Sequence, residues 1–380
     1  MQEVFIIAEN IVSPLGLTAA ENFEQLKKGN SGIRLQTEEK LSTEPVHAAV
    51  FNNDQQFEIK NRSRYSKFEQ ILIASISDAL GKTDIDVKNK RTLFIVSSTK
   101  GNISLLEEVE SVDEEIKKKI AISTSAQLVA DYFHFANKPI VISHACISGL
   151  AAIITAMRLM QSGQYDHAVV TGGDIITKFI LSGFQSFQAV SAEPCKPFDA
   201  ARNGITLGEG AATVILSLKK PANATAIKVC SGATSNDANH ISGPSRSGEE
   251  LYQAISMAMK DAGVQQKDID FISAHGTATI YNDEMEAKAI NLANMQDTPV
   301  NSLKGFYGHT LGAAGLIETV AAVYSLKEGI ILPTLGFSKT GTSKPLNVSN
   351  KILKKELTTC LKTASGFGGC NAAIVLKKIN

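Results

Sequence analysis

One cysteine lies where the chain passes from an apolar run into a segment of small residues. Cys146 follows PIVISHA and precedes ISGLAAIITAMRLM, a pattern that predicts a strand, a turn and then a helix. A thiol at a helix N-terminus lies among unpaired peptide N–H groups, which favour the nucleophilic thiolate. We therefore expect a nucleophile at Cys146, with a buried structural cysteine as the alternative.

Two histidines occupy similar places further along the chain. His275 ends the predicted strand DIDFISA and precedes the turn GTAT, and His309 lies in SLKGFYGHTLGAAG before a predicted helix. Residues at the C-terminal ends of strands in an open α/β sheet face the crevice in which ligands bind. Each histidine alone is more often a core residue. Together with Cys146, the two histidines predict one pocket.

Charged and glycine residues near these side chains predict supporting roles. Lys304 adjoins an apolar predicted helix and needs a carboxylate partner, for which Glu318 is the candidate. The backbone of SGFGGCN, residues 365–371, offers donors for an oxyanion hole opposite Cys146, with a plain β-turn as the alternative. Residues 197–210 lack the GxxxxGK[ST] pattern of a phosphate-binding loop, so we do not expect nucleotide binding there.

Two pairs of similar segments indicate that the elements around these residues are duplicated. GEGAATVILSLKK resembles GFGGCNAAIVLKK, and the strand–turn–helix pattern from Val141 resembles the one from Val300. Many α/β proteins share such patterns, but two pairs in the same order favour duplication. We predict two related α/β halves, residues 1–221 and 222–380, which meet in KKPANATA, where Pro221 ends a strand.

The composition limits the class of protein. With 380 residues, 43% hydrophobic residues and 38 basic against 38 acidic side chains, the chain predicts an apolar core and disfavours disorder and nonspecific nucleic-acid binding. Five scattered cysteines without CxxC spacing favour free thiols over a disulfide framework or a structural metal site. Without a basic signal sequence or a membrane-length apolar run, a cytoplasmic protein is expected.

Five motifs in order, ACISG, PFDAARNGITLGEGA, HGTAT, SLKGFYGHTLGAAG and GFGGCN, resemble those of the β-ketoacyl-acyl carrier protein synthases. These are the condensing enzymes of fatty acid and polyketide synthesis. The resemblance covers essentially the whole chain, and its two histidines are similar to those of the elongating members. It implies a thiolase-like fold of two similar α/β halves in αβαβα layers. It also implies no bound cofactor, substrates carried on the phosphopantetheine of an acyl carrier protein, and a homodimer, with a heterodimer as the alternative.

The resemblance also implies a decarboxylative Claisen condensation and a set of residue roles. Cys146 would carry the acyl group, while His275 and His309 would support decarboxylation of a malonyl thioester. The remaining implied roles are an ion pair behind the second histidine (Lys304, Glu318), oxyanion N–H groups (Cys146, Phe367), an acyl-pocket gate (Phe367), substrate binding (Thr277, Thr279, Gly368, Gly369) and carrier-protein contacts (Lys60, Arg64, Arg202).

This chain departs from the family pattern near the predicted gate. Ser365 replaces a phenylalanine and Cys370 a threonine, which leaves acyl-chain selectivity open. Two rival functions remain at this stage. One is a degradative thiolase, in which Cys370 would be a second catalytic thiol. The other is a silent partner subunit similar to a chain-length factor, a class that lacks the reactive cysteine.

Overall fold

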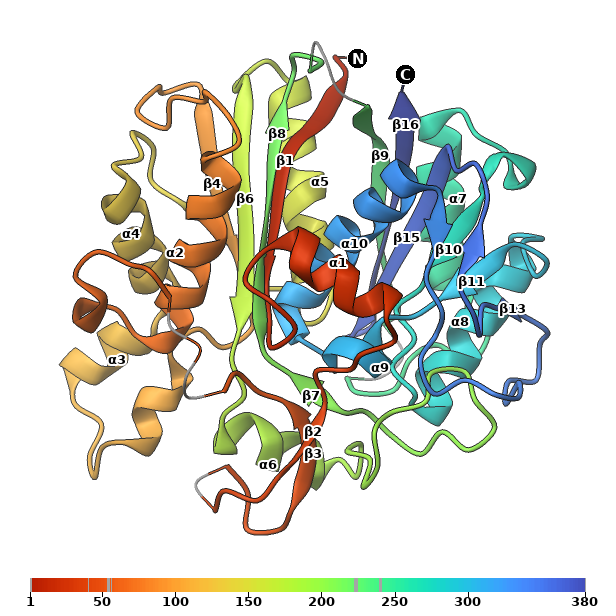
Figure 1. The fold of residues 1–380 in the computed structure, drawn as a ribbon, viewed down its shortest axis with the longest axis horizontal. Coiled ribbons are helices and arrows are strands. Elements are labelled where there is room, and N and C mark those ends of the chain that lie inside the picture. The colour runs from red at the N-terminus through yellow and green to blue at the C-terminus, as the bar shows by residue number, and fades with distance from the viewer. Residues whose placement is uncertain are drawn as a thin grey trace.

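A computed structural model describes residues 2–39, 41–52, 55, 57–221, 225–238 and 241–379. Its main feature is an eleven-stranded sheet in the order β13-β11-β10-β15-β16-β9-β1-β8-β6-β4-β5 (Figure 1). The first half of the chain contributes β1 (Val4–Val12), β4 (Thr92–Ser97), β5 (Ile140–Ile142), β6 (His167–Asp174) and β8 (Gly210–Ser217). The second half contributes β9 (Ala226–Asn236), β10 (Phe271–Ser273), β11 (Pro299–Asn301), β13 (Asn347–Val348), β15 (Thr359–Gly366) and β16 (Cys370–Ile379).

The two halves of the sheet repeat one topology. The order β1-β8-β6-β4-β5 in the first half corresponds to β9-β16-β15-β10-β11 in the second. In both runs the first two pairings are antiparallel and the next two are parallel. The runs join where β1 pairs antiparallel with β9. The predicted duplicated α/β fold is therefore confirmed, while the predicted boundary adjoins residues 222–224, which lie outside the described residues.

Helices cover both faces of each half-sheet. On the outer side of the first half lie α2 (Lys67–Leu80) and α4 (Ile122–Phe133), and on the outer side of the second lie α7 (Glu249–Ala262) and α8 (Ile280–Leu292) (Figure 1). Between the half-sheets lie α5 (Ser148–Gln161) and α10 (Ala314–Glu328), which contact each other and strands of both halves. This order of layers is the predicted αβαβα arrangement.

Shorter elements complete the fold. They include the helices α1 (Ala19–Lys27), α3 (Glu114–Ile120), α6 (Lys178–Ser186) and α9 (Lys304–Tyr307). One small sheet has the order β2-β3-β7 (Arg34–Gln36, Val46–Ala49, Leu207–Gly208), and another pairs β12 (Ile330–Ile331) with β14 (Leu353–Lys354). The 3₁₀ helices are Arg62–Arg64, Ile103–Glu107, Gln266–Asp268 and Leu311–Ala313.

The central helices pack closely because glycines lie at their contact. A Cβ on Gly149 of α5 would stand 2.8 Å from the Leu316 nitrogen, and one on Gly315 of α10 would stand 2.4 Å from Leu150 Cδ1. Both helices are almost wholly buried, which explains why their sequences are apolar on several sides. Because Cys146 precedes α5 and His309 precedes α10, this contact brings the two predicted site segments together.

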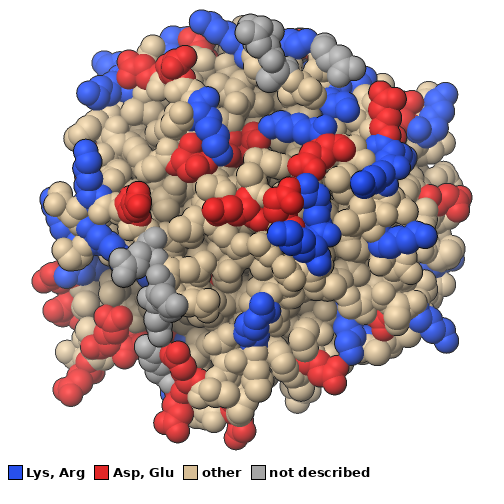
Figure 2. Space-filling model, viewed as in Figure 1, with Lys and Arg blue, Asp and Glu red and all other residues tan. Residues whose placement is uncertain are grey.

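The surface carries charges of both signs. Figure 2 shows basic and acidic side chains interspersed over most of one face, with acidic groups gathered at the lower left, where Figure 1 places α3. Exposed carboxylates there include Glu110, Asp113, Glu114 and Glu115. Among the helices of the described residues, none has the length and apolar character needed to cross a bilayer.

Candidate active site

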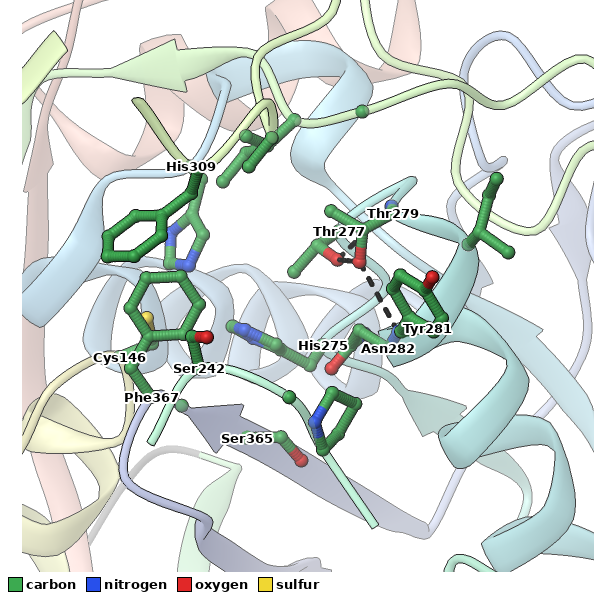
Figure 3. A pocket seen from close by; sticks show the side chains of 18 of the residues that line it. Cys146, Ser242, His275, Thr277, Thr279, Tyr281, Asn282, His309, Ser365 and Phe367 are labelled. Atoms are coloured by element: carbon green, nitrogen blue, oxygen red, sulfur yellow. Dashed lines mark hydrogen bonds between the residues drawn. The ribbon is translucent and has the colours of Figure 1, made fainter. Parts of the chain in front are cut away.

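The predicted nucleophile and both histidines line one cavity. Its volume is about 400 Å³, and Figure 3 shows Cys146, His275 and His309 facing its interior. One ligand-type atom from each of the three side chains lies within 4.8 Å of the others. The two imidazole rings meet edge to face, with centroids 5.0 Å apart. The structure therefore brings together three residues that are far apart in the sequence.

Local backbone geometry presents Cys146 to the cavity. The cysteine lies between β5 and α5, directly after Ala145, whose φ of 45° is in the left-handed region that alanine rarely adopts. A Cβ on Gly366 would stand 2.9 Å from the Cys146 nitrogen, so only glycine allows the end of β15 to lie this close to the nucleophile. The Phe367 peptide N–H donates a hydrogen bond to Cys146.

The expectation that the helix N-terminus favours thiolate in the free protein is wrong. Burial raises the pKa of Cys146 to about 12, and nearby Cys370 adds to this effect while the Lys304 ammonium opposes it. Helix α5 begins at Ser148, two residues after the cysteine. At neutral pH the Cys146 side chain is therefore a thiol.

Backbone contacts at both ends of the residue hold His275. Its peptide N–H donates to Glu286 Oε1 at 2.8 Å, and its carbonyl accepts from Lys304 Nζ at 2.9 Å. Its Nδ1 atom lies 3.4 Å from Lys304 Nζ, and an ammonium group can only donate. The neutral ring therefore carries its proton on Nε2.

His309 has the same tautomer for a different reason. Its Nδ1 atom accepts the Leu311 peptide N–H at 3.0 Å, which leaves the proton on Nε2. No described residue accepts a hydrogen bond from this Nε2 atom, which is buried beside the cavity. Its loop is held from behind, because Gly312 N–H donates to the buried carboxylate of Asp174 at 2.7 Å.

Both imidazoles are neutral donors at physiological pH. Burial, and after it the Lys304 ammonium, lowers the pKa of His275 and of His309 well below 6.5. Cys–His–His is also a ligand set for zinc, and a metal binds the unprotonated nitrogen of a neutral imidazole. In both rings that nitrogen is Nδ1, which already accepts a hydrogen bond, while Nε2 carries the proton. The arrangement favours two N–H donors aimed at an anionic oxygen over a metal centre.

The ion pair expected between Lys304 and Glu318 is present. Lys304 Nζ contacts Glu318 Oε1, and the two side chains are almost fully buried. Sequence reasoning missed Lys362 of β15, whose Nζ lies 2.7 Å from the other Glu318 oxygen. A signal was available, because Lys362 is the one charged residue in the segment TCLKTASG and needs a partner for the same reason as Lys304.

Two phenylalanines lie beside the predicted gate residue, Phe367. The Phe367 ring is 38% exposed and lies 5.6 Å, centroid to centroid, from both Phe184 and Phe187. Phe184 and Phe187 come from α6 and the residue after it, and sequence reasoning missed both. The backbone N–H groups of Cys146 and Phe367 adjoin the sulfur, as an oxyanion hole requires. Gating by Phe367 remains a prediction.

Three of the four predicted substrate-binding residues line the cavity. Thr277 and Thr279 line it, and their hydroxyl oxygens are 2.9 Å apart (Figure 3). Thr279 also caps α8, because its side chain accepts the Asn282 N–H. Gly369 lines the cavity, whereas Gly368 is one residue outside it and donates to the Ile241 carbonyl.

The three residues predicted to contact a carrier protein do not share one environment. Lys60 and Arg64 are exposed, before and within the 3₁₀ helix that precedes α2. Arg202 is only 9% exposed, and its guanidinium donates to the Asp199 and Gly341 carbonyls. The structure therefore does not support a surface role for Arg202, because its charge is used to join two loops.

Comparison with known families identifies the chain. Residues 1–222 match the N-terminal domain of beta-ketoacyl synthases, and residues 226–338 match their C-terminal domain. The fold and the Cys–His–His cavity agree with these matches. The chain belongs to the beta-ketoacyl synthase family.

Relatives of known sequence and structure are similar over the full length. The 3-oxoacyl-[acyl-carrier-protein] synthase 2 of Staphylococcus aureus is 28% identical, with 99% of this chain and 98% of that protein aligned. The Rhizobium meliloti protein of the same name is also 28% identical, with 100% and 99% aligned. The ishigamide ketosynthase/chain length factor matches at a TM-score of 0.89 and 24% identity, covering all of both chains. A beta-ketoacyl synthase from Burkholderia phymatum matches at 0.89 and 23%, again over both chains.

Proposed function

We propose that this protein is a 3-oxoacyl-[acyl-carrier-protein] synthase that joins an acyl group held on Cys146 to a malonyl unit by decarboxylative Claisen condensation. The observation that carries the proposal is the convergence of one thiol and two neutral Nε2–H donors in a single cavity. The full-length similarity to proteins of that name supports it. The same chemistry serves fatty acid synthesis and polyketide or polyene synthesis.

The first half-reaction transfers the acyl group. The Cys146 sulfur attacks the carbonyl carbon of the incoming thioester, and the departing thiolate takes the proton that Cys146 loses. Negative charge develops on the carbonyl oxygen, where the backbone N–H groups of Cys146 and Phe367 stabilise it. Raising the sulfur pKa by burial disfavours a free thiolate, so attack and proton loss proceed together once the substrate fills the cavity.

The second half-reaction forms the carbon–carbon bond. The bond between the malonyl carboxylate and its α-carbon breaks, CO₂ leaves, and the electron pair remains as an enolate. The His275 and His309 Nε2–H groups donate to the enolate oxygen, and each such donor contributes about 10²–10³ in rate. The α-carbon then attacks the Cys146 thioester, and the tetrahedral intermediate releases the cysteine thiolate, which takes a proton from water.

Two hydroxyl groups that line the cavity support delivery of the substrate on a carrier. Thr277 and Thr279 place two hydroxyl groups beside the route to Cys146, where they would hydrogen-bond a phosphopantetheine arm. We propose acyl carrier protein as the partner, with Lys60 and Arg64 as contacts and no resident cofactor. One solved relative is described as a type II polyketide acyl-carrier protein in complex with its ketosynthase.

We further propose that the protein acts as a dimer in the cytoplasm. Strand β5 is a half-buried edge of the large sheet and leads directly to Cys146, so pairing of two such edges would support the nucleophile. A homodimer is our first expectation. A heterodimer is the alternative, because one solved relative is a ketosynthase in complex with its chain length factor. The five free cysteines fit a reducing compartment.

The test is a reconstituted condensation assay. Purified protein is incubated with malonyl carrier protein and a panel of acyl carrier proteins, and the 3-oxoacyl product and CO₂ are measured. Cys146→Ala should abolish condensation, whereas Cys230→Ala, which changes a half-buried cysteine outside the cavity, should not. Equal activity of the two variants would refute the proposal.

The same assay separates the rival functions. A degradative thiolase would turn over coenzyme A thioesters without malonate, and Cys370→Ala would then abolish activity. A silent partner subunit would show no acylation of Cys146 and no CO₂ release until an active synthase is added. Light scattering on the purified protein distinguishes a homodimer from a monomer awaiting a different subunit.

A further inference from the structure

A second buried lysine lies behind the candidate active site. Lys362 has no exposed surface, and its Nζ atom is 2.7 Å from Glu318 Oε2. Lys304 contacts the other oxygen of the same carboxylate. Glu318 therefore lies between two ammonium groups, one from α9 and one from β15. Lys362 does not line the cavity, so it cannot touch the substrate.

The two lysines also hold the end of the strand that presents His275. Lys362 Nζ donates to the Ser273 carbonyl at 3.1 Å and to the Ala274 carbonyl at 3.4 Å. Lys304 Nζ donates to the next carbonyl, that of His275, at 2.9 Å. Three consecutive carbonyls are thus fixed by two cations that share one anion. Lys362 Nζ also donates to the Thr363 carbonyl, at 2.6 Å.

Burying the Lys362 ammonium costs free energy, which points to a role other than stabilising the fold. Burial lowers the pKa of Lys362, and only the nearby carboxylates oppose this effect. Replacing buried ion pairs by apolar residues is often neutral or stabilising in proteins, so a second buried lysine is weak evidence of a stability role. Its positive charge does act on the imidazoles, because it contributes to the lowered pKa of both His275 and His309.

Several other charged or titratable groups face this cluster. Glu286 of α8 accepts the His275 N–H and the Thr363 hydroxyl, and therefore supplies a second carboxylate. The two lysines and two carboxylates give a cluster whose charges can balance. Other titratable groups that interact with it or lie beside it are Cys146 before α5, Cys195, Asp283 of α8, Tyr307 of α9 and Cys360 of β15.

We infer that Lys362 is a positioning residue for the reaction: it holds Glu318 and the carbonyl end of β10 so that His275 and His309 present neutral N–H donors to the enolate. This inference rests on the proposed function. Lys362 is a second cation beside the predicted Lys304–Glu318 pair, and its charge disfavours protonation of the two imidazoles. A purely structural lysine would stabilise the fold without changing the protonation of the histidines.

The experiment compares Lys362→Gln with Lys362→Met. Glutamine keeps a donor for the strand carbonyls but removes the charge, and methionine removes both. Lys377→Met, on neighbouring β16, is the matched control, because Lys377 is half-buried and does not line the cavity. Malonyl decarboxylation is measured as a function of pH for each folded variant, together with kcat and KM.

The expected results distinguish charge from structure. At an effective dielectric constant near 20, one unit charge shifts a pKa by about three units at a separation of about 4 Å and still by about one unit at about 12 Å. The acidic limb of the rate profile should therefore move up by at least about one pH unit in both Lys362 variants, with kcat reduced about tenfold and KM little changed. The control should match the wild type. A folded Lys362→Gln protein with the wild-type acidic limb would overturn the inference.

A second readout does not need activity. Titration of isotope-labelled histidines by nuclear magnetic resonance, with assignment from His275→Asn and His309→Asn, reports the imidazole pKa values directly. Upward shifts in Lys362→Gln support the inference even if the wild type fails to decarboxylate malonate, in which case only the proposed function fails. Unshifted resonances refute the role of Lys362 whatever the activity.

Discussion

The buried neutral histidines should make stability depend on pH in a defined direction. The folded pKa of His309 lies well below 6.5, while the unfolded chain has the ordinary value. Below about pH 6.5 the unfolded state therefore binds a proton that the folded state does not. Stability from this group is complete above the unfolded pKa and is lost as the pH falls toward the folded pKa.

The magnitude follows from the linkage relation. Between about pH 7.5 and pH 5.5, a histidine that stays neutral when folded reduces the free energy of unfolding by about 1.4 kcal/mol. His275 has a pKa lowered in the same direction and adds a similar amount. The substitution His309→Asn should remove one of these contributions, because asparagine does not titrate and its oxygen can accept the Leu311 N–H in place of Nδ1.

The assay is urea unfolding of both proteins at the two pH values. Titrating groups other than His275 contribute equally to both proteins, so the comparison reports on His309 and on its effect on the pKa of His275. The wild type should lose about 1.4 kcal/mol more than His309→Asn on acidification, with unchanged dependence on denaturant. Equal losses would show that His309 protonates freely in the fold, and the argument for a neutral N–H donor would then fail.

Three further predictions test the surroundings of the site. Glu318→Gln leaves two buried ammonium groups without their carboxylate and should destabilise the protein by about 3–5 kcal/mol in urea unfolding; a change below about 1 kcal/mol would contradict the buried ion pair. Gly208→Ala would place a Cβ 1.8 Å from the Tyr307 carbonyl oxygen and should abolish soluble folded protein, whereas Gly183→Ala, which has open space, should not. Alkylation of Cys146 by iodoacetamide, followed by mass spectrometry, should still accelerate with pH above about 9, since burial raises the thiol pKa to about 12; a plateau near neutral pH would show a stable thiolate.

The elements of the fold were predicted well where a sequence pattern occurs twice in the chain. The glycine-led apolar segments at 208–220 and 366–378 correspond to β8 and β16, which hold equivalent places in the two half-sheets. The turn-to-helix patterns around Cys146 and His309 also correspond to the observed elements. Such features are local, because apolar periodicity and glycine position determine them within a few residues.

Features that depend on distant neighbours could not be predicted in this way. The pKa of Cys146 depends on how much water the folded chain excludes, so the helix-terminus argument gave the wrong direction. Arg202 lies in a polar motif yet is buried, because its partners Asp199 and Gly341 come from two different loops. Lys362 can reach the carbonyls at the end of β10 only because β15 pairs with β10. Each case requires tertiary contacts that no local pattern encodes.

The antiparallel pairing of β1 with β8 and β9 constrains how the chain acquires its structure during synthesis. Phe5 pairs with Ser217 and Lys228, so β1 lies at the centre of the finished sheet, and both of its partner strands are synthesised about 200 residues after it. Until then an apolar strand with two unpaired edges remains exposed to nonspecific association. We expect slow folding, dominated by this long-range closure, and a need for chaperone protection of β1 during synthesis.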